Sequence, residues 1–473
     1  MASPTRVKII ATVGPATNSY EIIKRLISEG VSCFRINYSH GEPKIWDEWI
    51  NYIRDASAEL DTVVSIMGDL PGPQIRIGDI KPQEIHTKDK ILLVLGNSAS
   101  EEKTIPIPIK KVFETLEIGD LVLLDDGKIM LRVEDVSENQ AVATALNDGV
   151  LLPHKTLVIH GKEINLPSLT ERDVQYVKYS VNKDITFLAL SYVRTSKDVE
   201  VVRDLVGRLT RDPLKLVAKI ETRSAVNNLR SIIEASDAVI IARGDLGMHY
   251  SLEELPFLQK RIAHLSLKYG KPSIVATQLL ETMVNYPRPS RSEVVDVMNA
   301  VMDLIDALLL TNETATGKYP IETIRWLKRI VRIAEANINK TSIESIRSDS
   351  ASTLREKYAL GLTLLAEHIN AKILVYTKTG TIPSLISRYR PQVDVYAGSA
   401  DHKISEELTI RYGIRPYRIR VVKEDKRIDY DKGVQLLYNM LKQIGEIEYG
   451  DIIAEAYGRK ETEIHSIKIR QVI

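Results

Sequence analysis

Short apolar runs recur along the chain and alternate with longer segments whose apolar residues repeat at helical spacing. Parallel strands that are buried on both faces have this continuous apolar character. Such runs lie at residues 7–13, 32–37, 62–69, 185–191, 215–220, 237–242, 272–277 and 305–311. Amphipathic helical patterns lie at residues 20–28, 43–58, 171–181, 197–209, 223–235, 252–269, 292–302 and 320–336. The alternation predicts an α/β fold, a (β/α)8 TIM barrel, although a doubly wound sheet would also alternate.

One interval, between residues 69 and 170, departs from this rhythm. It has no convincing amphipathic helix, and short alternating runs lie at residues 91–95, 121–124, 129–133 and 141–145. The step Asp125-Asp126-Gly127 is typical of a β-hairpin turn, and a turn is the simplest interpretation of it. We therefore expect an inserted all-β domain after the third strand, beside the C-terminal mouth of the barrel, where a lid would lie.

A polar stretch at residues 339–345 separates the barrel pattern from a second α/β pattern. This pattern predicts a helix at 353–369, a strand at 371–377, a helix at 382–388, a strand at 393–397 and a final strand at 463–471. The expected domains are a first barrel part (1–70), the β lid (71–153), a second barrel part (154–340) and a C-terminal α/β domain (341–473).

Composition narrows the class of protein. Among 473 residues, 64 are basic and 63 acidic, so bulk charge gives no reason to expect a nucleic-acid partner. No apolar run of about 18 residues and no signal peptide are seen, so we expect a cytoplasmic protein with no membrane span. The single cysteine, Cys33, excludes internal disulfides and lies in an apolar strand, which favours a core thiol over a nucleophile.

Two neighbouring strand-like runs end in charged pairs, Lys219 with Glu221 and Arg243 with Asp245. Residues i and i+2 of a strand point to the same side, so each pair should project together if its strand runs that far. Two carboxylates can hold a divalent metal, and two cations can hold a phosphate. These runs therefore predict a phosphate-and-metal active site.

Other strands also end in polar residues, and barrel enzymes carry their catalytic groups at these ends. They include Thr12, Arg35, Asn37, Ser39, Asp69, Ser191 and Thr277. A helix cap or an exposed salt bridge would explain any one of them, but their convergence at one face favours an active site. The loop Thr377-Lys378-Thr379-Gly380-Thr381 joins a strand to a helix, and either a phosphate-binding loop or a simple turn fits it.

Several longer stretches carry a resemblance to a known family. They are KIIATVGPAT (8–17), FRINYSHG (34–41), GPQIR (72–76) after Asp69, DDG (125–127), AKIE (218–221), ARGDLG (242–247), ATQLLETM (276–283), PRPSRSEV (287–294) and NETA (312–315). In this order they resemble pyruvate kinase across almost the whole chain. The family's barrel, lid and C-terminal domain match the three parts predicted above.

The resemblance implies phosphoryl transfer from phosphoenolpyruvate to ADP, giving pyruvate and ATP in the last step of glycolysis. It implies that Glu221 and Asp245 hold Mg2+ or Mn2+, that Lys219 and Arg35 contact the phosphoryl group, and that backbone N–H groups of Gly244 and Asp245 receive the substrate carboxylate. Thr277 would belong to the proton-delivery path. The nucleotide would be faced by Asn37, His40 and Arg76.

Two departures from the family pattern matter. The family's loop Asp-Thr-Lys-Gly-Pro-Glu is replaced here by Asp-Leu-Pro-Gly-Pro-Gln, so Gln74 takes the place of an acid. The K+ ligands implied by position are Asn37, Ser39, Asp69 and the Leu70 carbonyl, and without the acid we expect weak or absent K+ dependence. The lid lysine motif is also lost. Lys155 is the expected nucleotide-binding lysine, and Lys162 is its competitor.

The loop at residues 377–381 resembles the family's effector-phosphate loop, which implies a phosphorylated allosteric effector, although an unregulated enzyme is the alternative. The resemblance also implies a homotetramer. Two other functions compete: a metal-dependent aldolase or lyase of pyruvate enolate chemistry, and a non-catalytic metabolite-binding protein. The lyase has no reason to combine Lys219, the β lid and the Arg76 loop. A binding protein would be favoured only if Lys219, Thr277 or a metal carboxylate were missing, and all are present, so we expect the kinase.

Overall fold

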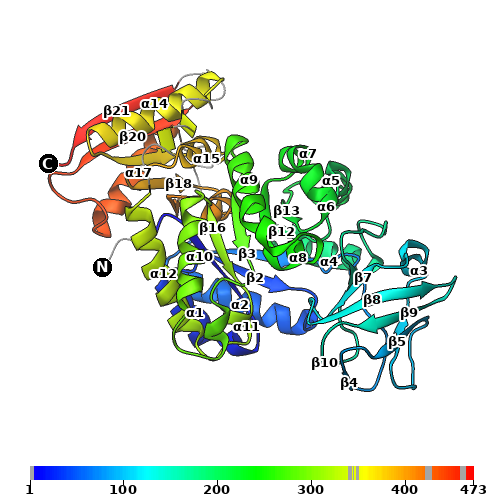
Figure 1. Cartoon of the computed structure of the whole chain (residues 1–473). Helices are drawn as coiled ribbons and strands as arrows, with labels where there is room; N and C mark the ends of the chain where they lie inside the picture. The colour runs from blue at the N-terminus through cyan, green and yellow to red at the C-terminus, as the bar shows by residue number, and fades with distance from the viewer. Residues whose placement is uncertain (1–4, 339–342, 345, 348–350, 421–428, 459–464) are drawn as a thin grey trace.

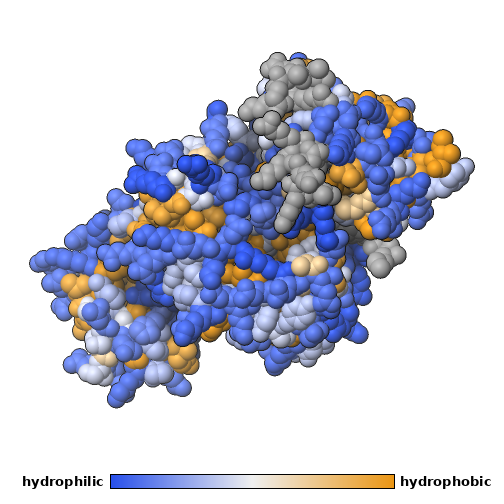
Figure 2. Space-filling view, turned by 180° about the vertical axis from the view of Figure 1, so that it is seen from behind, coloured by the Kyte–Doolittle hydropathy of each residue, from blue (hydrophilic) through white to orange (hydrophobic). Residues whose placement is uncertain are grey.

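The computed structural model describes residues 5–338, 343–344, 346–347, 351–420, 429–458 and 465–473. Three bodies follow one another in space, with a central barrel between the inserted lid domain and the C-terminal domain (Figure 1). The face in Figure 2 is mainly hydrophilic, with apolar residues in scattered patches. Among the described residues, no helix has the length and apolar character needed to cross a bilayer.

Eight parallel strands close into a barrel in the order β1-β16-β15-β14-β13-β12-β3-β2, which confirms the predicted fold and excludes the doubly wound sheet. The strands are β1 (Lys8–Thr12), β2 (Cys33–Asn37), β3 (Ser65–Asp69), β12 (Phe187–Leu190), β13 (Lys215–Ile220), β14 (Ala238–Ala242), β15 (Ser273–Ala276) and β16 (Ala307–Leu310). Buried apolar side chains, among them Ile10, Val217 and Ile240, fill the interior. Cys33 is one of them, and burial raises the pKa of its thiol to about 12, as expected of a core thiol.

Helices surround the barrel and bury one apolar face against its strands, as Ile23, Leu26 and Ile27 of α1 do. They are α1 (Tyr20–Glu29), α2 (Pro43–Glu59), α4 (Glu171–Asn182), α5 (Ser196–Leu209), α6 (Arg223–Asn227), α7 (Leu229–Ala235), α8 (Arg243–His249), α9 (Leu255–Lys268), α10 (Arg291–Met302), α11 (Asn312–Ala315) and α12 (Pro320–Ala336).

The single helix predicted at 223–235 is wrong, because the chain forms α6 and α7 with a break at Asn228. The Asn228 side-chain amide donates to the carbonyls of Arg194 at 3.1 Å and Ser224 at 3.0 Å. Asparagine side chains compete with the backbone for hydrogen bonds in this way and are poorly suited to helix interiors.

The lid contains a six-stranded sheet in the order β11-β7-β8-β9-β5-β6 and a two-stranded sheet of β10 and β4. Its strands are β4 (Gln83–Ile85), β5 (Lys90–Leu95), β6 (Thr104–Ile107), β7 (Leu121–Leu124), β8 (Ile129–Val136), β9 (Gln140–Ala145), β10 (Gly149–Leu151) and β11 (Leu157–Ile159). The hairpin turn is confirmed, since Leu124 pairs with Ile129. Two corrections follow: a short helix, α3 (Lys111–Thr115), interrupts the all-β pattern, and β11 extends the lid sheet beyond residue 153.

The C-terminal domain is a five-stranded sheet in the order β19-β18-β17-β20-β21, in which only β21 is antiparallel to its neighbour. Its elements are α14 (Leu354–His368), β17 (Lys372–Tyr376), α15 (Thr381–Arg388), β18 (Val395–Ser399), α16 (His402–Glu407), β19 (Ile414–Arg418), α17 (Tyr430–Gln443), β20 (Ile452–Gly458) and β21 (His465–Gln471). The sequence pattern missed β19, β20, α16 and α17. Residues 463–464 of the predicted last strand, and most of the polar stretch 339–345, lie outside the described residues.

The C-terminal domain covers the end of the barrel at which the strands begin. Arg390 is 1% exposed and donates to the Leu304 carbonyl and to Asp306, which directly precedes β16. Lys8, the first residue of β1, donates to the Ile414 carbonyl at 2.5 Å. The lid lies at the opposite end of the barrel, where the strands end (Figure 1).

Candidate active site

Lys219 and Glu221 come from the end of β13 and lie together, with 3.2 Å between Nζ and Oε2. The Lys219 ammonium also donates to Ser191 Oγ at 2.8 Å and lies 3.9 Å from Asp69 Oδ1. Burial lowers the pKa of Lys219, but the neighbouring carboxylates of Asp69 and Glu221 outweigh it and raise the pKa overall. Lys219 is therefore a fixed positive charge at neutral pH.

A second cation, Arg35 at the end of β2, lies beside the carboxylate of Asp69. Its Nε donates to Asp69 Oδ2 at 2.6 Å, and its Nη1 donates to Thr12 Oγ1 at 3.1 Å. Asp69 is 3% exposed and bridges Arg35 and Lys219. Two of the predicted cations therefore meet at the mouth of the barrel.

Arg243 does not lie with Lys219 and Arg35. Strand β14 ends at Ala242 and Arg243 begins helix α8, so the predicted projection of Arg243 beside Asp245 is wrong. Residues two apart in a helix point in very different directions, unlike those in a strand. The guanidinium instead donates to both carboxylate oxygens of Asp296 at 2.7 Å and to the carbonyls of Thr277 at 2.8 Å and Gln278 at 3.0 Å.

The carboxylate of Glu221 is buried, that of Asp245 is partly buried, and the two repel each other. Burial raises the pKa of Glu221 to about 7 against the opposing charge of Lys219, and Asp245 raises it further. Burial likewise raises the pKa of Asp245, again opposed by Lys219. Glu221 Oε1 accepts a hydrogen bond from Tyr192 N at 2.5 Å, whereas the buried Oε2 has the ion pair with Lys219 at 3.2 Å but no hydrogen bond within the described part of the chain.

This donor set fits a divalent cation. The buried carboxylate of Glu221, whose Oε2 has no hydrogen bond, and the partly buried carboxylate of Asp245 offer the hard oxygen ligands that Mg2+ prefers. No group of three or more His, Cys, Asp or Glu side chains with metal-site geometry occurs among the described residues. Mg2+ commonly takes only one or two protein carboxylates and completes its shell with water and substrate oxygens, so two are enough.

Thr277 follows β15 and is held in an unusual conformation. Its φ is +69°, which is rare for a β-branched residue, and Gln278 has φ +52°. Thr277 Oγ1 accepts the N–H of Gly244 at 2.8 Å, so its own hydroxyl proton remains available. Gly244 and Asp245 lie in the first turn of α8, where N–H groups lack partners within the helix.

The four positions implied for K+ meet at the ends of β2 and β3, where Asn37 pairs with Asp69. Three of them already accept hydrogen bonds. Asn37 Oδ1 accepts from Ser39 N at 3.1 Å, the Leu70 carbonyl accepts from Ser191 Oγ at 2.7 Å, and Asp69 is paired as described above.

The residues expected to face the nucleotide lie where the lid joins the barrel. Burial lowers the pKa of His40, and the nearby charge of Arg76 lowers it further. Arg76 donates to Gln74 Oε1 at 2.5 Å and to the His154 carbonyl at 2.8 Å. Lys155, which follows His154 in the chain, forms an ion pair with Asp125 of the lid hairpin, with 2.9 Å between Nζ and Oδ1.

Lys162, the competing lysine, is engaged elsewhere in the lid. Its Nζ lies 2.7 Å from Glu117 Oε2 and 2.8 Å from Asp120 Oδ2. Both lysines are therefore already paired, Lys162 with two carboxylates and Lys155 with one.

The loop at residues 377–381 belongs to the C-terminal domain and is not brought to this site. Thr377 Oγ1 accepts the Gly380 N–H at 2.9 Å, and Thr379 and Thr381 share a hydrogen bond of 2.9 Å. Lys378 Nζ lies 4.6 Å from the centre of the Tyr430 ring.

Three residues that the sequence interpretation did not place in the site contribute to it. Tyr192 directly follows Ser191, a strand-end residue, and this position was its only signal. Asp126, interpreted as part of a turn, lies close enough to raise the pKa of Asp245, so the lid hairpin extends over the site. Asp296 lies on α10, and nothing in the local sequence connects it with Arg243.

The barrel, its lid and a cluster of two cations and three carboxylates at the mouth of the barrel define a barrel enzyme of the phosphotransferase class. Residues 4–324 match the family "Pyruvate kinase, barrel domain", and residues 356–469 match "Pyruvate kinase, alpha/beta domain". The chain belongs to the pyruvate kinase family.

Individual pyruvate kinases match most of this chain or nearly all of it. Pyruvate kinase from Aeropyrum pernix is 37% identical over 98% of this chain and 99% of its own, and the enzyme from Thermococcus litoralis is 36% identical over 87% and 88%. A crystal structure of a pyruvate kinase from Cryptosporidium parvum superposes with a TM-score of 0.91 at 29% identity, covering 99% of this chain and 96% of that one. The family's general reaction converts phosphoenolpyruvate and ADP to pyruvate and ATP, and the family is generally Mg-dependent.

Proposed function

We propose that this chain carries out the family's phosphoryl transfer at the cluster around Lys219. The observation that carries the proposal is a lysine, 16% exposed, held between Glu221, Asp69 and Ser191, with Arg35 paired to Asp69 as well. Charge stabilisation and positioning are the main contributions a protein makes to phosphoryl transfer. Lys219 and Arg35 bind the phosphoryl group of phosphoenolpyruvate and neutralise its charge during transfer.

Glu221 and Asp245 hold the divalent cation, Mg2+ or Mn2+, which supplies Lewis-acid stabilisation of negative charge on the substrate oxygens when bound. The closeness of the buried Glu221 to the partly buried Asp245 supports this assignment, because a divalent cation offsets the repulsion between their carboxylates. The N–H groups of Gly244 and Asp245, in the first turn of α8, receive the substrate carboxylate, and the Gly244 N–H then shares its hydrogen bond between this carboxylate and Thr277 Oγ1.

Thr277 belongs to the path that delivers a proton to the enolate carbon. Its oxygen accepts from Gly244, which leaves its O–H free to donate towards the substrate. Arg243 acts through this residue as a positioning residue, because its guanidinium binds the carbonyls of Thr277 and Gln278.

ADP binds between the lid and the barrel, against Asn37, His40, Arg76 and Lys155. The position of Asp126 near Asp245 supports a lid that covers the site. Exclusion of water by the lid favours transfer to ADP over hydrolysis.

The remaining assignments are also proposals. K+ dependence is weak or absent, supported by the neutral Gln74 and by the hydrogen bonds already made by Asn37, Asp69 and Leu70. The loop at residues 377–381 binds a phosphorylated effector, the chain forms a homotetramer, and the enzyme is cytoplasmic, in keeping with the buried thiol of Cys33.

The test is pyruvate formation from phosphoenolpyruvate, ADP and Mg2+. We expect Lys219→Met and Glu221→Gln each to lower kcat by about 10²- to 10³-fold or more, because each removes a charge from the reacting centre. Lys24→Met, which alters an exposed pair with Glu59, is the control and should leave turnover unchanged. If folded wild-type protein forms no pyruvate, the lyase or binding-protein alternatives replace the kinase.

A further inference from the structure

Thr12 is the last residue of β1, and its buried hydroxyl lies against Arg35, the cation that contacts the phosphoryl group. Its Oγ1 accepts from Arg35 Nη1 at 3.1 Å and donates to the Leu310 carbonyl at 2.8 Å. A hydroxyl has one proton and two lone pairs. Because the Leu310 carbonyl takes the proton, Thr12 presents a fixed acceptor to the guanidinium.

Two anchors thus set the orientation of the Arg35 guanidinium. Its Nε donates to Asp69 Oδ2 at 2.6 Å, and its Nη1 donates to Thr12. A guanidinium is planar and carries five N–H groups, so anchors on two different nitrogens define its plane and leave three N–H groups that can face the substrate. With Asp69 alone, the guanidinium could pivot about a single hydrogen bond.

The backbone of Thr12 is held by a side chain, because β16 stops short of it. The register pairs Ala11 with Leu310, the last residue of β16, so Thr12 extends past the end of that strand. Thr314 Oγ1 takes the place of a strand neighbour: it accepts from the Thr12 N–H at 3.0 Å and donates to the Thr12 carbonyl at 2.9 Å. The Thr311 carbonyl, at 3.4 Å, is the more distant acceptor. One hydroxyl therefore satisfies two buried backbone groups.

Thr314 is fully buried on α11, and this helix packs directly against the chain that follows β1. A Cβ atom added at Gly14 would lie 2.6 Å from the carbonyl oxygen of Ala315 and 2.9 Å from its Cα, so a glycine is needed for the approach. The motif NETA (312–315) thus acts on the end of β1 through its threonine.

We propose that Thr12 and Thr314 are positioning residues for phosphoryl transfer, joined in a chain of hydrogen bonds that runs from α11 through the end of β1 to Arg35. The chain fixes the guanidinium before the substrate arrives, and such pre-organisation avoids the cost of reorienting it during the reaction. Neither threonine has to touch the substrate. This inference rests on the proposed role of Arg35 in binding the phosphoryl group.

The first experiment compares Thr12→Val with Thr12→Ser in the full-length enzyme, by steady-state kinetics with phosphoenolpyruvate, ADP and Mg2+. Valine keeps the shape of threonine but removes the acceptor. We expect kcat/KM for phosphoenolpyruvate to fall by about ten- to a hundredfold while KM for ADP changes little. Serine keeps the hydroxyl and should recover most of this loss. No loss in Thr12→Val, or an equal loss in both variants, would overturn the proposal.

A double-mutant cycle with Arg35→Lys tests whether Thr12 acts through Arg35. Lysine lacks the second nitrogen that Thr12 orients, so adding Thr12→Val to Arg35→Lys should cost about threefold or less. Losses that multiply would show that the two residues act independently, and would overturn this inference alone. Unchanged turnover in Arg35→Lys would overturn the proposed function of Arg35, and this inference with it.

Thr314→Val tests the far end of the chain. It leaves the N–H and C=O of Thr12 without a partner, so we expect the same kinetic pattern, with recovery in Thr314→Ser. Full activity in folded Thr314→Val would overturn the role of α11. If Thr314→Val does not fold, the Thr12 variants and the double-mutant cycle decide the question.

Thr363→Val is the matched control. Its hydroxyl is equally buried but donates to the Ala359 carbonyl at 2.8 Å, within a helix of the C-terminal domain. It should leave turnover unchanged. A loss equal to that of Thr314→Val would reduce the effect to a general loss of stability and refute the assignment.

Discussion

At the scale of single residues, the turn after β15 shows how one side chain holds another in place. Thr277 and Gln278 both have positive φ, and such backbone costs on the order of 1–3 kcal/mol for each residue. Arg243 binds both of their carbonyls and is itself fixed by Asp296. Three long-range contacts therefore stabilise a conformation that the local sequence disfavours.

Substitution of Arg243 by lysine tests this arrangement. A lysine cannot reach two carbonyls and a carboxylate with one ammonium group in the same geometry. We expect kcat to fall by about ten- to a hundredfold while KM for ADP changes little, because Thr277 moves and the nucleotide site does not. Steady-state kinetics with a varied nucleotide measures this split, and an unchanged kcat would contradict the positioning role. Asp296→Asn should show the same pattern more weakly.

Gln74 provides a second prediction at this scale. It is neutral and accepts a hydrogen bond from Arg76 at 2.5 Å. Gln74→Glu restores the negative charge that the family's loop carries at this position, so we expect turnover of the variant to become K+-dependent while wild type works without K+. Rates with and without K+, at constant ionic strength set by tetramethylammonium, measure the effect. A wild-type enzyme that already needs K+ would refute the proposal.

At the scale of elements, β1 begins next to the C-terminal domain, and its first residue, Lys8, is a partly buried lysine that donates to the Ile414 carbonyl of that domain. Burial lowers the pKa of Lys8 to about 8 from 10.5, Arg415 lowers it further, and Glu335 opposes both. The folded protein therefore binds fewer protons at Lys8 than the unfolded chain does between these two values. The charged lysine costs stability below pH 8, and this cost disappears as the pH rises to 10.5.

The variant Lys8→Met has no titrating group at this position, so its stability lacks this dependence on pH. We expect the stability of wild type relative to the variant to rise by on the order of 3 kcal/mol between pH 7 and pH 10.5, from the size of the pKa difference. Guanidinium unfolding curves of both proteins at the two pH values measure it. Curves whose difference does not change with pH would show that Lys8 is not desolvated in the folded state.

At the scale of the whole molecule, the barrel carries the lid at one end and the C-terminal domain at the other (Figure 1). Among the described residues, Arg390 and Asp306 form the most deeply buried ion pair between the C-terminal domain and the barrel. Their side chains are 1% and 5% exposed. Removing one partner of a buried pair leaves the other charge without compensation.

We therefore expect Arg390→Met to lower the free energy of unfolding by about 3–5 kcal/mol, and to separate the melting of the C-terminal domain from that of the barrel. Differential scanning calorimetry would resolve the two transitions. Arg420→Met is the control, because Arg420 and Asp61 form an exposed pair between the same two domains, worth about 1 kcal/mol or less. Equal losses in both variants would argue against a special role for the buried pair.

The elements that could be predicted from the sequence are those whose signals are local. The barrel strands are continuous apolar runs, and Lys219 and Glu221 follow from strand alternation at the end of β13. The break at Asn228 and the start of α8 at Arg243 could not be predicted, because each depends on a partner distant in the chain, Arg194 in one case and Asp296 in the other.

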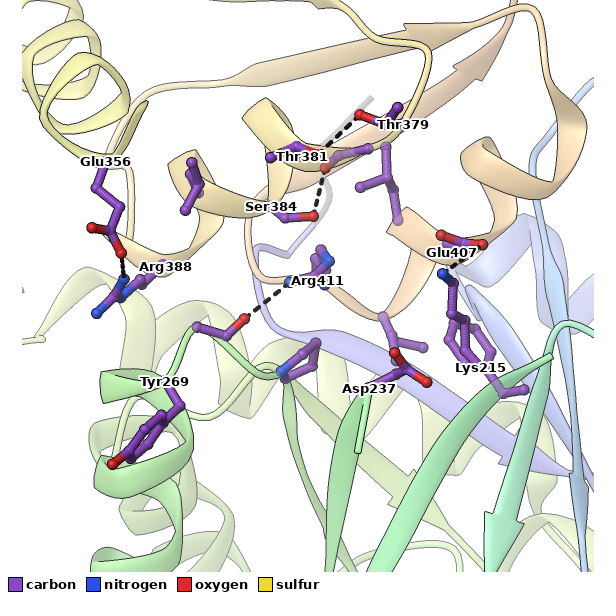
Figure 3. Close-up of a pocket in the computed structure, with 17 residues that line it drawn as sticks. Lys215, Asp237, Tyr269, Glu356, Thr379, Thr381, Ser384, Arg388, Glu407 and Arg411 are labelled. Atoms are coloured by element: carbon purple, nitrogen blue, oxygen red, sulfur yellow. Dashed lines mark hydrogen bonds and ion pairs between the residues drawn. The ribbon is translucent and has the colours of Figure 1, made fainter. Parts of the chain in front are cut away.

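By itself, the sequence determined the barrel, the inserted lid, the separate C-terminal domain and the polar strand ends that form the site, because periodicity and residue type act over a few neighbouring positions. The tertiary structure alone decided the rest. It turned Arg243 towards Asp296 and away from Asp245, and it brought the lid hairpin to Asp245. It also placed Arg411 in a cavity of about 330 Å³ between the C-terminal domain and the barrel, without an ion-pair partner among the described residues (Figure 3). Each of these depends on contacts between segments many residues apart, which no local pattern encodes.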